Sequence, residues 1–378
     1  MIKIRRTWAV SRKEFLHIVR DPRSLGMAIA IPMLLLVLFG YALTLDVDNV
    51  PMVVWDQSDT PEGRDLISRF GGSRYFAIRK YVTSYEQIDE AINSGEALAA
   101  LVIPTDFSEL LKAGYDAPVQ LLVDGSDSNT ATIVLGYVRN VVQGYSSQVL
   151  IDRMEQLTGQ SASPPIDFRP RTWFNPDLES KNYIIPGLIA VIMMVIAALL
   201  TSLTIAREWE RGSMEQLIST PIKGPELIAG KLLPYFAIGM LDVLLAVLMG
   251  EFLFDVPLRG MPALVFVMAA IFLMGALSLG MVISIVTKSQ LLASQLAMVL
   301  TFLPSFLLSG FMYAIGNMPK AIQVVTYAIP ARYFVSLLKG IYLKGVGLEV
   351  LIGEALLLTA FAVAAVLLAN LKFHKKLE

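Results

Sequence analysis

The stretch of sequence that decides the fold is Arg207–Pro221, which reads REWERGSMEQLISTP. It lies between two long apolar segments. Asn182–Ala206 has no charged residue, and Ile228–Gly250 has only Lys231 and Asp242. A charged segment between two membrane-length apolar segments has to lie in water, because charged side chains are costly inside a bilayer. The sequence therefore predicts a membrane protein with a short polar loop at this position.

This loop has the pattern of one self-stabilised helix. Glu208 and Arg211 are three residues apart, and Arg211 and Glu215 are four apart, which are the spacings that bring opposite charges together on a helix. The apolar residues of Met214–Ile218 recur on one face, so another part of the molecule should cover that face. We expect a single docking helix that ends at Pro221, where proline stops helix propagation.

The composition is that of a polytopic membrane protein. Hydrophobic residues make up 55% of the 378 residues and charged residues only 17%, because long runs carry no charge. A net charge of −1 gives no reason to expect a nucleic-acid partner. With no cysteine, disulfides and thiolate metal sites are excluded, and no other metal site is expected. No phosphate-binding G-x-x-x-x-G-K-[ST] pattern is present, so we expect any ATP hydrolysis to occur on another chain.

Apolar runs long enough to cross ~30 Å of hydrocarbon, at ~1.5 Å per residue, recur along the chain. They predict six transmembrane helices, at residues 24–45, 183–206, 227–250, 261–286, 291–313 and 350–371. The last five form a transmembrane domain of residues 182–371, which a tail of residues 372–378 follows. Within this domain, the amphipathic segment 314–347 is interrupted by Pro319 and Pro330, and we expect short re-entrant or interfacial helices there.

The first 23 residues alternate basic and apolar side chains, a pattern typical of an amphipathic helix on a membrane surface. A secretory signal peptide is the alternative. We disfavour it because the apolar run that follows has the length of a span and no small-residue cleavage site comes after it.

Residues 46–181 have the composition of an ordinary soluble domain. Strand-like runs alternate there with helical patterns, and a long helical pattern covers 130–157. This alternation predicts an α/β domain inserted between spans one and two. Asp124–Asn129 partly matches a calcium-binding loop, but the glycine at loop position six and the glutamate at position twelve are missing. A turn that caps the long helix is the favoured interpretation.

Basic residues in the short connections predict the orientation. The N-terminal segment, the 207–224 loop, Lys288 and the lysine-rich tail lie on one side of the membrane, and fewer basic residues lie on the other. The richer side is expected to be cytoplasmic. Both termini are then cytoplasmic, and the 46–181 domain is extracytoplasmic.

The string EWERGSMEQLISTP, Glu208–Pro221, resembles the signature of ABC type-2 transporter permeases, which usually reads E-x-E-x-G-T-x-E-x-L-x-x-T-P. Ser213 departs from the commoner threonine but keeps the hydroxyl group. Further similarities lie at 308–311, 317–319, 327–334 and 338–340. The strings at 97–107 and 124–127 resemble those of the bacterial drug-exporter-like subgroup, which has a large extracytoplasmic domain. The resemblance covers nearly the whole chain.

The resemblance implies the membrane subunit of a bacterial ABC exporter in the inner membrane. In this family the loop contacts a separate cytoplasmic ATPase subunit, which holds the ATP and Mg. The residues expected to couple the two subunits are Arg207, Glu208, Glu210, Arg211, Gly212, Ser213, Glu215, Leu217, Thr220 and Pro221. A second copy or a paralogue would pair with the chain among membrane lipids, and a periplasmic adaptor is a further partner of such assemblies.

Two acids, Asp242 and Glu354, fall well inside predicted spans. Charged groups at this depth usually face a bundle interior or a cavity, which predicts a place on the transport path or a proton site. The alternative is an interhelical hydrogen bond that fixes the packing. Since no charged cavity is evident, a lipophilic substrate, either a drug or a lipid, is favoured.

Two other functions remain open from the sequence. One is a proton-coupled secondary transporter that uses both acids, although the single large inserted domain and the lack of visible inverted repeats argue against it. The other is a membrane-anchored structural subunit that transports nothing.

Overall fold

A computed structural model of the chain describes residues 3–43, 47–158, 171, 173–176 and 179–373. The chain forms two compact units. One comprises Met1–Thr44 together with Arg171–Glu378, and the other is Leu45–Pro170. The predicted boundary between residues 45 and 46 and most of the predicted tail 372–378 lie outside the described residues.

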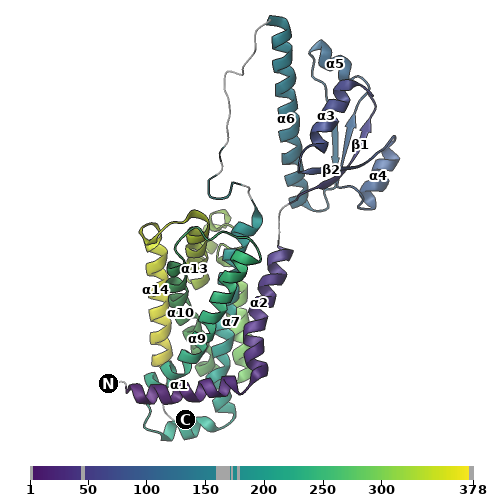
Figure 1. The fold of residues 1–378 in the computed structure, drawn as a ribbon. Coiled ribbons are helices and arrows are strands. Elements are labelled where there is room, and N and C mark those ends of the chain that lie inside the picture. The colour runs from purple at the N-terminus through teal and green to yellow at the C-terminus, as the bar shows by residue number, and fades with distance from the viewer. Residues whose placement is uncertain (1–2, 44–46, 159–170, 172, 177–178, 374–378) are drawn as a thin grey trace. The chain divides into compact units, whose positions relative to one another are not determined.

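The described part of the first unit is helical, and α7 is its central helix (Figure 1). Its long helices are α1 (Ile4–Val19), α2 (Pro22–Ala42), α7 (Ser180–Glu210), α9 (Gly224–Phe252), α10 (Pro262–Thr287), α11 (Gln290–Leu308) and α14 (Leu348–Lys372). Helix α7 packs against α2, α9, α10, α11 and α13, so its apolar side chains are buried nearly all round, as expected of the central helix of a bundle.

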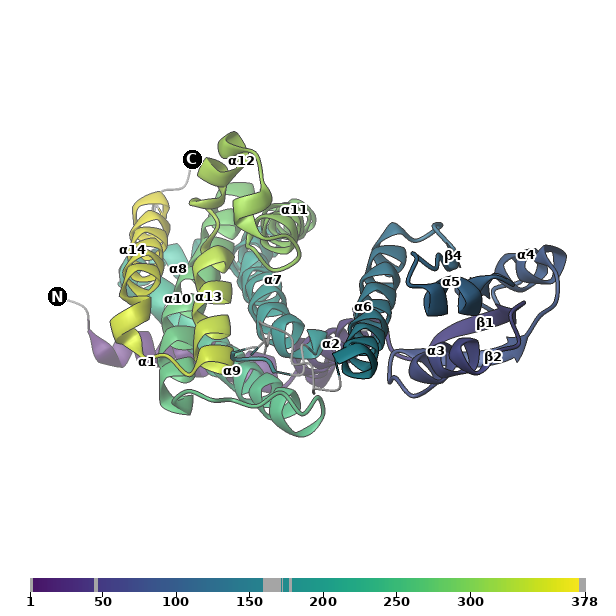
Figure 2. The ribbon, with the colours of Figure 1, turned by 90° about the horizontal axis from the view of Figure 1, so that it is seen from above.

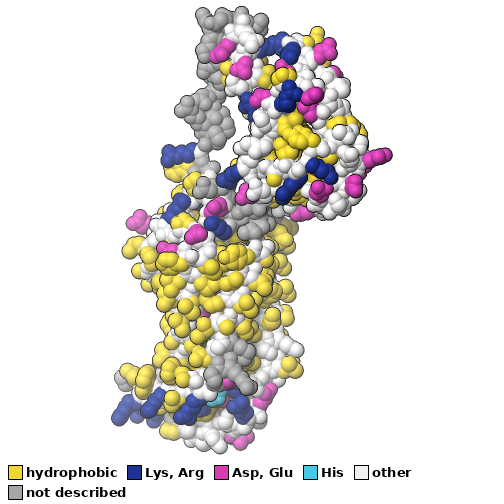
Figure 3. Space-filling view, turned by 45° about the vertical axis from the view of Figure 1, so that its right-hand side comes forward, with side chains coloured by type: hydrophobic (Ala, Val, Ile, Leu, Met, Phe, Trp, Pro, Cys, Tyr) yellow, Lys and Arg dark blue, Asp and Glu magenta, His cyan; other side chains and the backbone are white. Residues whose placement is uncertain are grey.

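Among the described residues, five helices are long and apolar enough to cross a membrane: α7, α9, α10, α11 and α14. A sixth candidate is a pair of helices, Lys320–Thr326 and Pro330–Lys344, bent by 87° at the break. In α2 the apolar stretch is shorter, Ala28–Ala42, so the first span stays a prediction. Figure 3 shows a broad band of hydrophobic side chains across the visible face of the first unit, with Lys and Arg side chains gathered at the end where α1 lies. These features confirm a polytopic helical membrane protein.

The contact between α7 and α10 combines close backbone approach with polar bonds. A Cβ atom on Gly280 would lie 2.3 Å from the carbonyl oxygen of Ala198, so only glycine fits there. Thr201 donates a hydrogen bond to the carbonyl of Leu277 at 2.7 Å, and the hydroxyl of Ser284 accepts from two backbone amides of α7 at 2.9 and 3.0 Å. Small residues and hydroxyl groups are the usual means by which helices associate in membranes.

The single docking helix predicted over Arg207–Pro221 is wrong. Helix α7 continues through the charged residues to Glu210, and α8 is a separate short helix, Ser213–Ser219. Between them Gly212 has φ of +68°, a left-handed conformation that glycine adopts without steric cost and that ends an α-helix. Among the described residues, no ion pair joins Arg211 to Glu208 or to Glu215. Glu208 faces the protein interior instead, and the break at Gly212 separates Arg211 from the helix that contains Glu215.

The segment 314–347 forms short helices, which agrees with the sequence. They are η1 (Ile315–Asn317), α12 (Lys320–Thr326), α13 (Pro330–Lys339) and a π-helical turn, η2 (Gly340–Lys344). Helix α11 ends at Leu308, five residues before the predicted end of the fifth span, because the chain turns at Gly310, where φ is +80°. Helix α13 packs against α7 and α14, so this segment is part of the bundle.

The second unit contains a four-stranded sheet in the order β2-β1-β3-β4 (Figure 2). Strand β1 (Val50–Asp56) pairs in parallel with β2 (Phe76–Tyr81) and β3 (Ala99–Ile103), and β3 pairs antiparallel with β4 (Gln120–Val123). The helices are α3 (Pro61–Gly71), α4 (Tyr85–Asn93), α5 (Phe107–Ala113) and α6 (Ser128–Thr158). These elements agree with the predicted alternation of strands and helices.

Alternate residues of the strands face two different hydrophobic layers, as strand geometry requires. Val50, Met52 and Val54 pack with α3 and α6, whereas Val53 packs with α4. Asp127 caps α6 as expected, since its carboxylate accepts a hydrogen bond from the amide of Asn129 at 3.0 Å.

Glu62 connects three helices of this unit. Its carboxylate accepts hydrogen bonds from Lys112 at 2.9 Å and Ser108 at 2.6 Å, both on α5, and its carbonyl accepts from Tyr145 of α6. The bonds to the carboxylate, first that from Lys112 and then that from Ser108, lower the pKa of the Glu62 carboxyl to about 2.

Candidate functional site

A buried cluster of charges joins three helices at the end of the bundle where α1 lies (Figure 1). Lys231 of α9 is 1% exposed, and its ammonium group contacts Glu14 of α1 and lies 3.0 Å from Oε1 of Glu208 on α7. Lys13 of α1 donates to the same Glu208 oxygen at 3.1 Å. Since charges buried away from water persist only when they are paired, this cluster fixes α1 against α7 and α9.

A second contact holds the start of α1. The fully buried carboxylate of Glu226, in the first turn of α9, accepts hydrogen bonds from the backbone amides of Lys3 at 2.7 Å and Lys223 at 3.0 Å. Arg6 lies 3.8 Å from the same carboxylate and donates to the carbonyl of Pro221, at the end of the loop. The N-terminal helix and the 207–224 loop therefore share their polar contacts.

The close packing of α1 on α9 depends on Gly230. A Cβ atom there would lie 2.7 Å from Cβ of Val10 and 2.8 Å from the carbonyl oxygen of Thr7. Contacts this short do not occur between real atoms, so any other residue would force the two helices apart.

Three predicted coupling residues tie the end of α7 to the structure. Glu208 belongs to the buried cluster. Glu210 accepts hydrogen bonds from the backbone amide of Gln290 at 2.7 Å and from its side chain, and so caps the first turn of α11. Arg207 donates to Oε1 of the same Gln290 at 3.3 Å.

The remaining predicted coupling residues lie in and around α8. Ser213 donates to the carbonyl of Glu208 at 3.4 Å, and Leu217 packs against the core of the bundle. Arg211, Gly212, Glu215 and Pro221 are exposed, and Thr220 donates to the carbonyl of Leu217 at 2.6 Å. The short helix is thus attached to the bundle by one face, and Glu215 within it and Arg211 before it are exposed.

Sequence reasoning missed Glu14, Arg6, Glu226 and Lys231. Two signals could have found the central pair: Glu14 is the only acid among the basic residues of the first helix, and Lys231 is the only base in its apolar segment. A lone acid in a basic helix and a lone base in an apolar segment are natural partners, because a base buried in an apolar segment is costly without an acid beside it.

The two acids inside predicted spans are not brought together. Asp242 of α9 is fully buried, and neither of its carboxylate oxygens has a hydrogen-bond partner among the described residues. Glu354 of α14 is half-buried and lines a cavity of about 440 Å³ to which Asp242 does not contribute. The interhelical hydrogen bond considered for these acids is therefore not observed for either of them within the described part of the chain.

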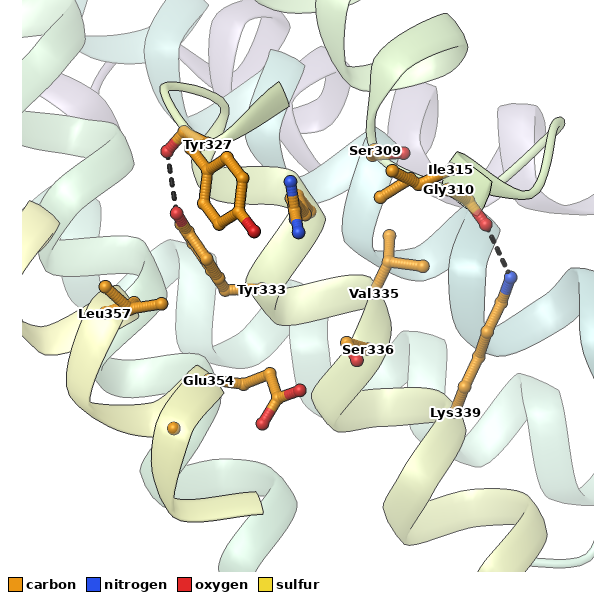
Figure 4. Close-up of a pocket in the computed structure, with 12 residues that line it drawn as sticks. Ser309, Gly310, Ile315, Tyr327, Tyr333, Val335, Ser336, Lys339, Glu354 and Leu357 are labelled. Carbon is orange, nitrogen blue, oxygen red and sulfur yellow. Dashed lines mark hydrogen bonds between the residues drawn. The ribbon is translucent and has the colours of Figure 1, made fainter. Parts of the chain in front are cut away.

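The cavity around Glu354 is lined by both polar and apolar side chains (Figure 4). Its polar groups come largely from α13 and include Arg332 and Lys339, and its apolar wall includes Ile315, Val335 and Leu357. A separate, mostly apolar cavity of about 290 Å³ lies between α1, α2, α7 and α9, with His17, Asp21 and Arg207 among its lining residues.

The sequence is similar to that of known transporter proteins along almost its whole length. The ABC-2 family transporter protein model matches residues 22–371. A relative in Escherichia coli K12, named "Probable multidrug ABC transporter permease YbhS", is 41% identical over 375 residues, which cover 99% of this chain and 98% of the relative. A second from the same organism, YbhR, is named in the same way and is 29% identical over 91% of this chain and 92% of its own. The linearmycin resistance permease protein LnrN of Bacillus subtilis 168 is 23% identical over 94% of this chain and 95% of its own.

Proposed function

The chain belongs to the ABC-2 family of transporter proteins and is the permease subunit of an ABC exporter, and we propose that it exports lipophilic compounds, drugs or lipids, across a bacterial inner membrane. The observation that carries this proposal is the full-length similarity to permeases whose names specify multidrug transport and linearmycin resistance. The mostly apolar cavity between α1, α2, α7 and α9 supports it, since an apolar lining with a polar rim suits amphiphilic molecules.

The ATPase is a separate subunit, and in our proposal ATP and Mg bind there. The exposed residues Arg211 and Glu215, beside the short helix α8, would meet this partner. A displacement of α8 would reach α1 through the contact between Arg6 and Pro221, and it would reach α7 and α9 through the buried Lys231 cluster. The coupling element is then a layer made of α1 and α8 together, with both termini and this layer in the cytoplasm.

In this proposal the α/β unit, Leu45–Pro170, is extracytoplasmic, and six helices span the membrane. A second copy or a paralogue pairs with the chain, surrounded by membrane lipids. A periplasmic adaptor would complete the path across the envelope. Between the two acids, Glu354 is the better candidate for the transport path, because it lines a cavity with a polar surface.

Inside-out membrane vesicles test the function. Vesicles that contain the chain and its co-expressed ATPase should accumulate a lipophilic fluorescent substrate when ATP is added, and vesicles that lack either subunit should not. Accumulation driven by a proton gradient without ATP would identify a secondary transporter, and no accumulation of any tested compound would favour a structural subunit.

A separate variant tests the proposed contact between α8 and the ATPase. Charge reversal at Glu215 should reduce ATP-driven transport without affecting assembly, because this side chain is exposed and makes no hydrogen bond or ion pair with any described residue. Glu210 is unsuitable for this test, since Glu210→Lys would also remove the cap of α11. Normal transport by Glu215→Lys would remove α8 from the proposed interface.

A further inference from the structure

The cavity between α13 and α14 contains a carboxylate that the protein itself does not neutralise. Glu354 extends from α14 toward Ser336 of α13 (Figure 4). Among the described residues, it makes no hydrogen bond and no ion pair. An ionised carboxylate in a partly buried position is stabilised by a positive or hydrogen-bond-donating partner. The side chain is thus available to a ligand that enters the cavity.

Two basic side chains that line the same cavity, Arg332 and Lys339, have hydrogen-bond donors without acceptors among the described residues. Lys339 donates one hydrogen bond, to the carbonyl of Gly310 at 2.9 Å, and its ammonium group lies 3.4 Å from the ring centre of Tyr183. An ammonium group has three donors, so two make no hydrogen bond with the residues that the structure describes. No acid pairs with Lys339 within the described part of the chain.

Arg332 is held in place by neutral groups. One terminal nitrogen of its guanidinium donates to the hydroxyl of Thr326 and to the carbonyl of Gln323 at 3.3 Å, and the guanidinium lies 3.8 Å from the ring centre of Tyr327. These contacts leave the Nε and Nη2 donors without partners among the residues that the structure describes. A guanidinium fixed in this way is preorganised for a planar or tetrahedral anion.

The apolar wall continues outside the cavity. Leu357 lines the cavity and is half-exposed, and Val350, Ile352 and Leu356 of the same helix are exposed. A ligand whose headgroup occupies the cavity could therefore extend a hydrocarbon chain along α14, where the surface of the first unit is hydrophobic. A molecule that fits these features carries an anionic group, a cationic group and an apolar tail.

We propose that the cavity between α13 and α14 binds the zwitterionic headgroup of an amphiphile. Its phosphate or carboxylate would accept hydrogen bonds from Arg332 and Lys339, and its ammonium group would donate to Glu354. The inference concerns binding alone, and it holds whether or not the bound molecule is exported, so its failure would leave the proposed export function intact.

Three short-chain lipids with identical dihexanoyl tails test the headgroup preference. Native mass spectrometry of the purified full chain in detergent measures their relative affinities. We expect the zwitterionic phosphatidylethanolamine to bind about tenfold more tightly than the anionic phosphatidylglycerol, since a charge-assisted hydrogen bond contributes at least that factor. The cationic trimethylammonium lipid should bind most weakly because of Arg332 and Lys339. Equal binding of the zwitterionic and anionic lipids would overturn the proposal.

Variants assign the preference to the cavity. Glu354→Gln should lose the tenfold advantage of phosphatidylethanolamine and leave phosphatidylglycerol binding unchanged, whereas Lys339→Gln should weaken both. The matched control is Glu349→Gln, which removes an exposed acid of the same helix outside the cavity. Unchanged binding in Glu354→Gln would refute the assignment, and the headgroup ranking of the unmodified chain decides the question even if a variant fails to fold.

A further experiment distinguishes an exported amphiphile from a resident membrane lipid. In nanodiscs with the ATPase subunit, ATP should lower the occupancy of bound phosphatidylethanolamine if the site lies on the export path. Unchanged occupancy identifies a resident membrane lipid. Both results support the headgroup site, and an absence of bound zwitterionic lipid in either state would contradict it.

Discussion

The ammonium group of Lys231 lies 3.0 Å from Oε1 of Glu208, in a position from which water is almost entirely excluded. The first residue belongs to α9, and the second is part of the family signature at the end of α7. The same ammonium group contacts Glu14 of α1. One buried cation thus connects the signature loop to the N-terminal helix, so the two act as one layer.

Removal of this cation should both destabilise and uncouple the protein. Lys231→Met leaves Glu14 and Glu208 buried without their shared partner, and breaking a buried ion pair costs ~3–5 kcal/mol. We expect a lower unfolding temperature and a loss of ATP-driven transport. The triple variant Lys231→Met, Glu14→Gln, Glu208→Gln should recover most of the stability, because it removes the uncompensated charges. Arg12→Met, an exposed change on α1, is the control. If the Lys231→Met protein keeps the unfolding temperature and the ATP-driven transport of the unmodified protein, the cluster has no such role.

The close approach at Gly230 predicts a graded series. Gly230→Ala should destabilise the protein by ~1–3 kcal/mol, and Gly230→Val by more, since each added atom pushes α1 away from α9. Thermal unfolding and protease cleavage within α1 measure the two effects. Gly26→Ala serves as the control, because a Cβ atom there meets no neighbour within 4 Å and alanine favours a helix. If Gly230→Ala resembles this control, α1 is not held as closely as the structure indicates.

The orientation can be tested by labelling, because the chain has no cysteine of its own. A cysteine at Ser126 should react with a membrane-impermeant reagent added to intact spheroplasts, and one at Gln216 should react only after the membrane is opened. Both positions are exposed, so differences in reactivity report the side of the membrane and not burial. The reverse labelling pattern would place both termini outside.

Acid should weaken the α/β unit through Glu62. We expect residues 46–175 to form a soluble, cooperatively folding protein, since they contain a complete sheet with helices on both faces. The pKa of Glu62 is lowered to about 2, below its unfolded value. Its contribution to stability is therefore present above about pH 4.5 and is lost as the pH falls toward 2.

Urea unfolding midpoints between pH 2 and pH 6 measure this effect. Glu62→Gln should flatten the pH dependence in this window, whereas Glu86→Gln, which alters an exposed carboxylate of α4, should leave the curve unchanged. A pH dependence of Glu62→Gln identical to that of the unmodified protein would show that Glu62 is not responsible. An aggregated product would mean that other parts of the chain complete the core of this unit.

Substitution of Asp242 is expected to change stability and transport in opposite directions. Because its oxygens lack partners among the described residues, Asp242→Leu removes an unsatisfied buried polar group and should raise the unfolding temperature. If the acid acts in transport, the same change should lower ATP-driven transport, and Asp242→Asn should separate charge from shape. An Asp242→Leu protein that is more stable and fully active would end any functional role for this acid.

The sequence was most informative where a single periodicity or a whole motif decides the structure. Long apolar runs predicted α7, α9, α10 and α14 to within a few residues, because length and hydropathy alone define such helices. The long helical pattern over 130–157 located α6, Ser128–Thr158, equally well.

The errors came from positions where tertiary contacts override local patterns. Glu208 and Arg211 have the spacing of a helical ion pair, but Lys231, 23 residues further along the chain, provides a better partner for Glu208 in the protein interior. Gly212 then takes the left-handed conformation that separates α7 from α8. The cavity around Glu354 was equally out of reach, because its lining comes from segments between Ser309 and Leu357 that meet only in the folded bundle.

The hydroxyl bonds between α7 and α10 restrict how this protein can change shape. If one helix slid along the other by a single residue, the buried hydroxyl groups of Thr201 and Ser284 would lose their hydrogen-bond partners. The close contact between Ala198 and Gly280 would become a steric clash. These two helices therefore behave as one rigid unit. A change of shape that preserves this contact has to occur at other helix boundaries, such as those of α11 and α14, whose surfaces the described residues leave largely uncovered.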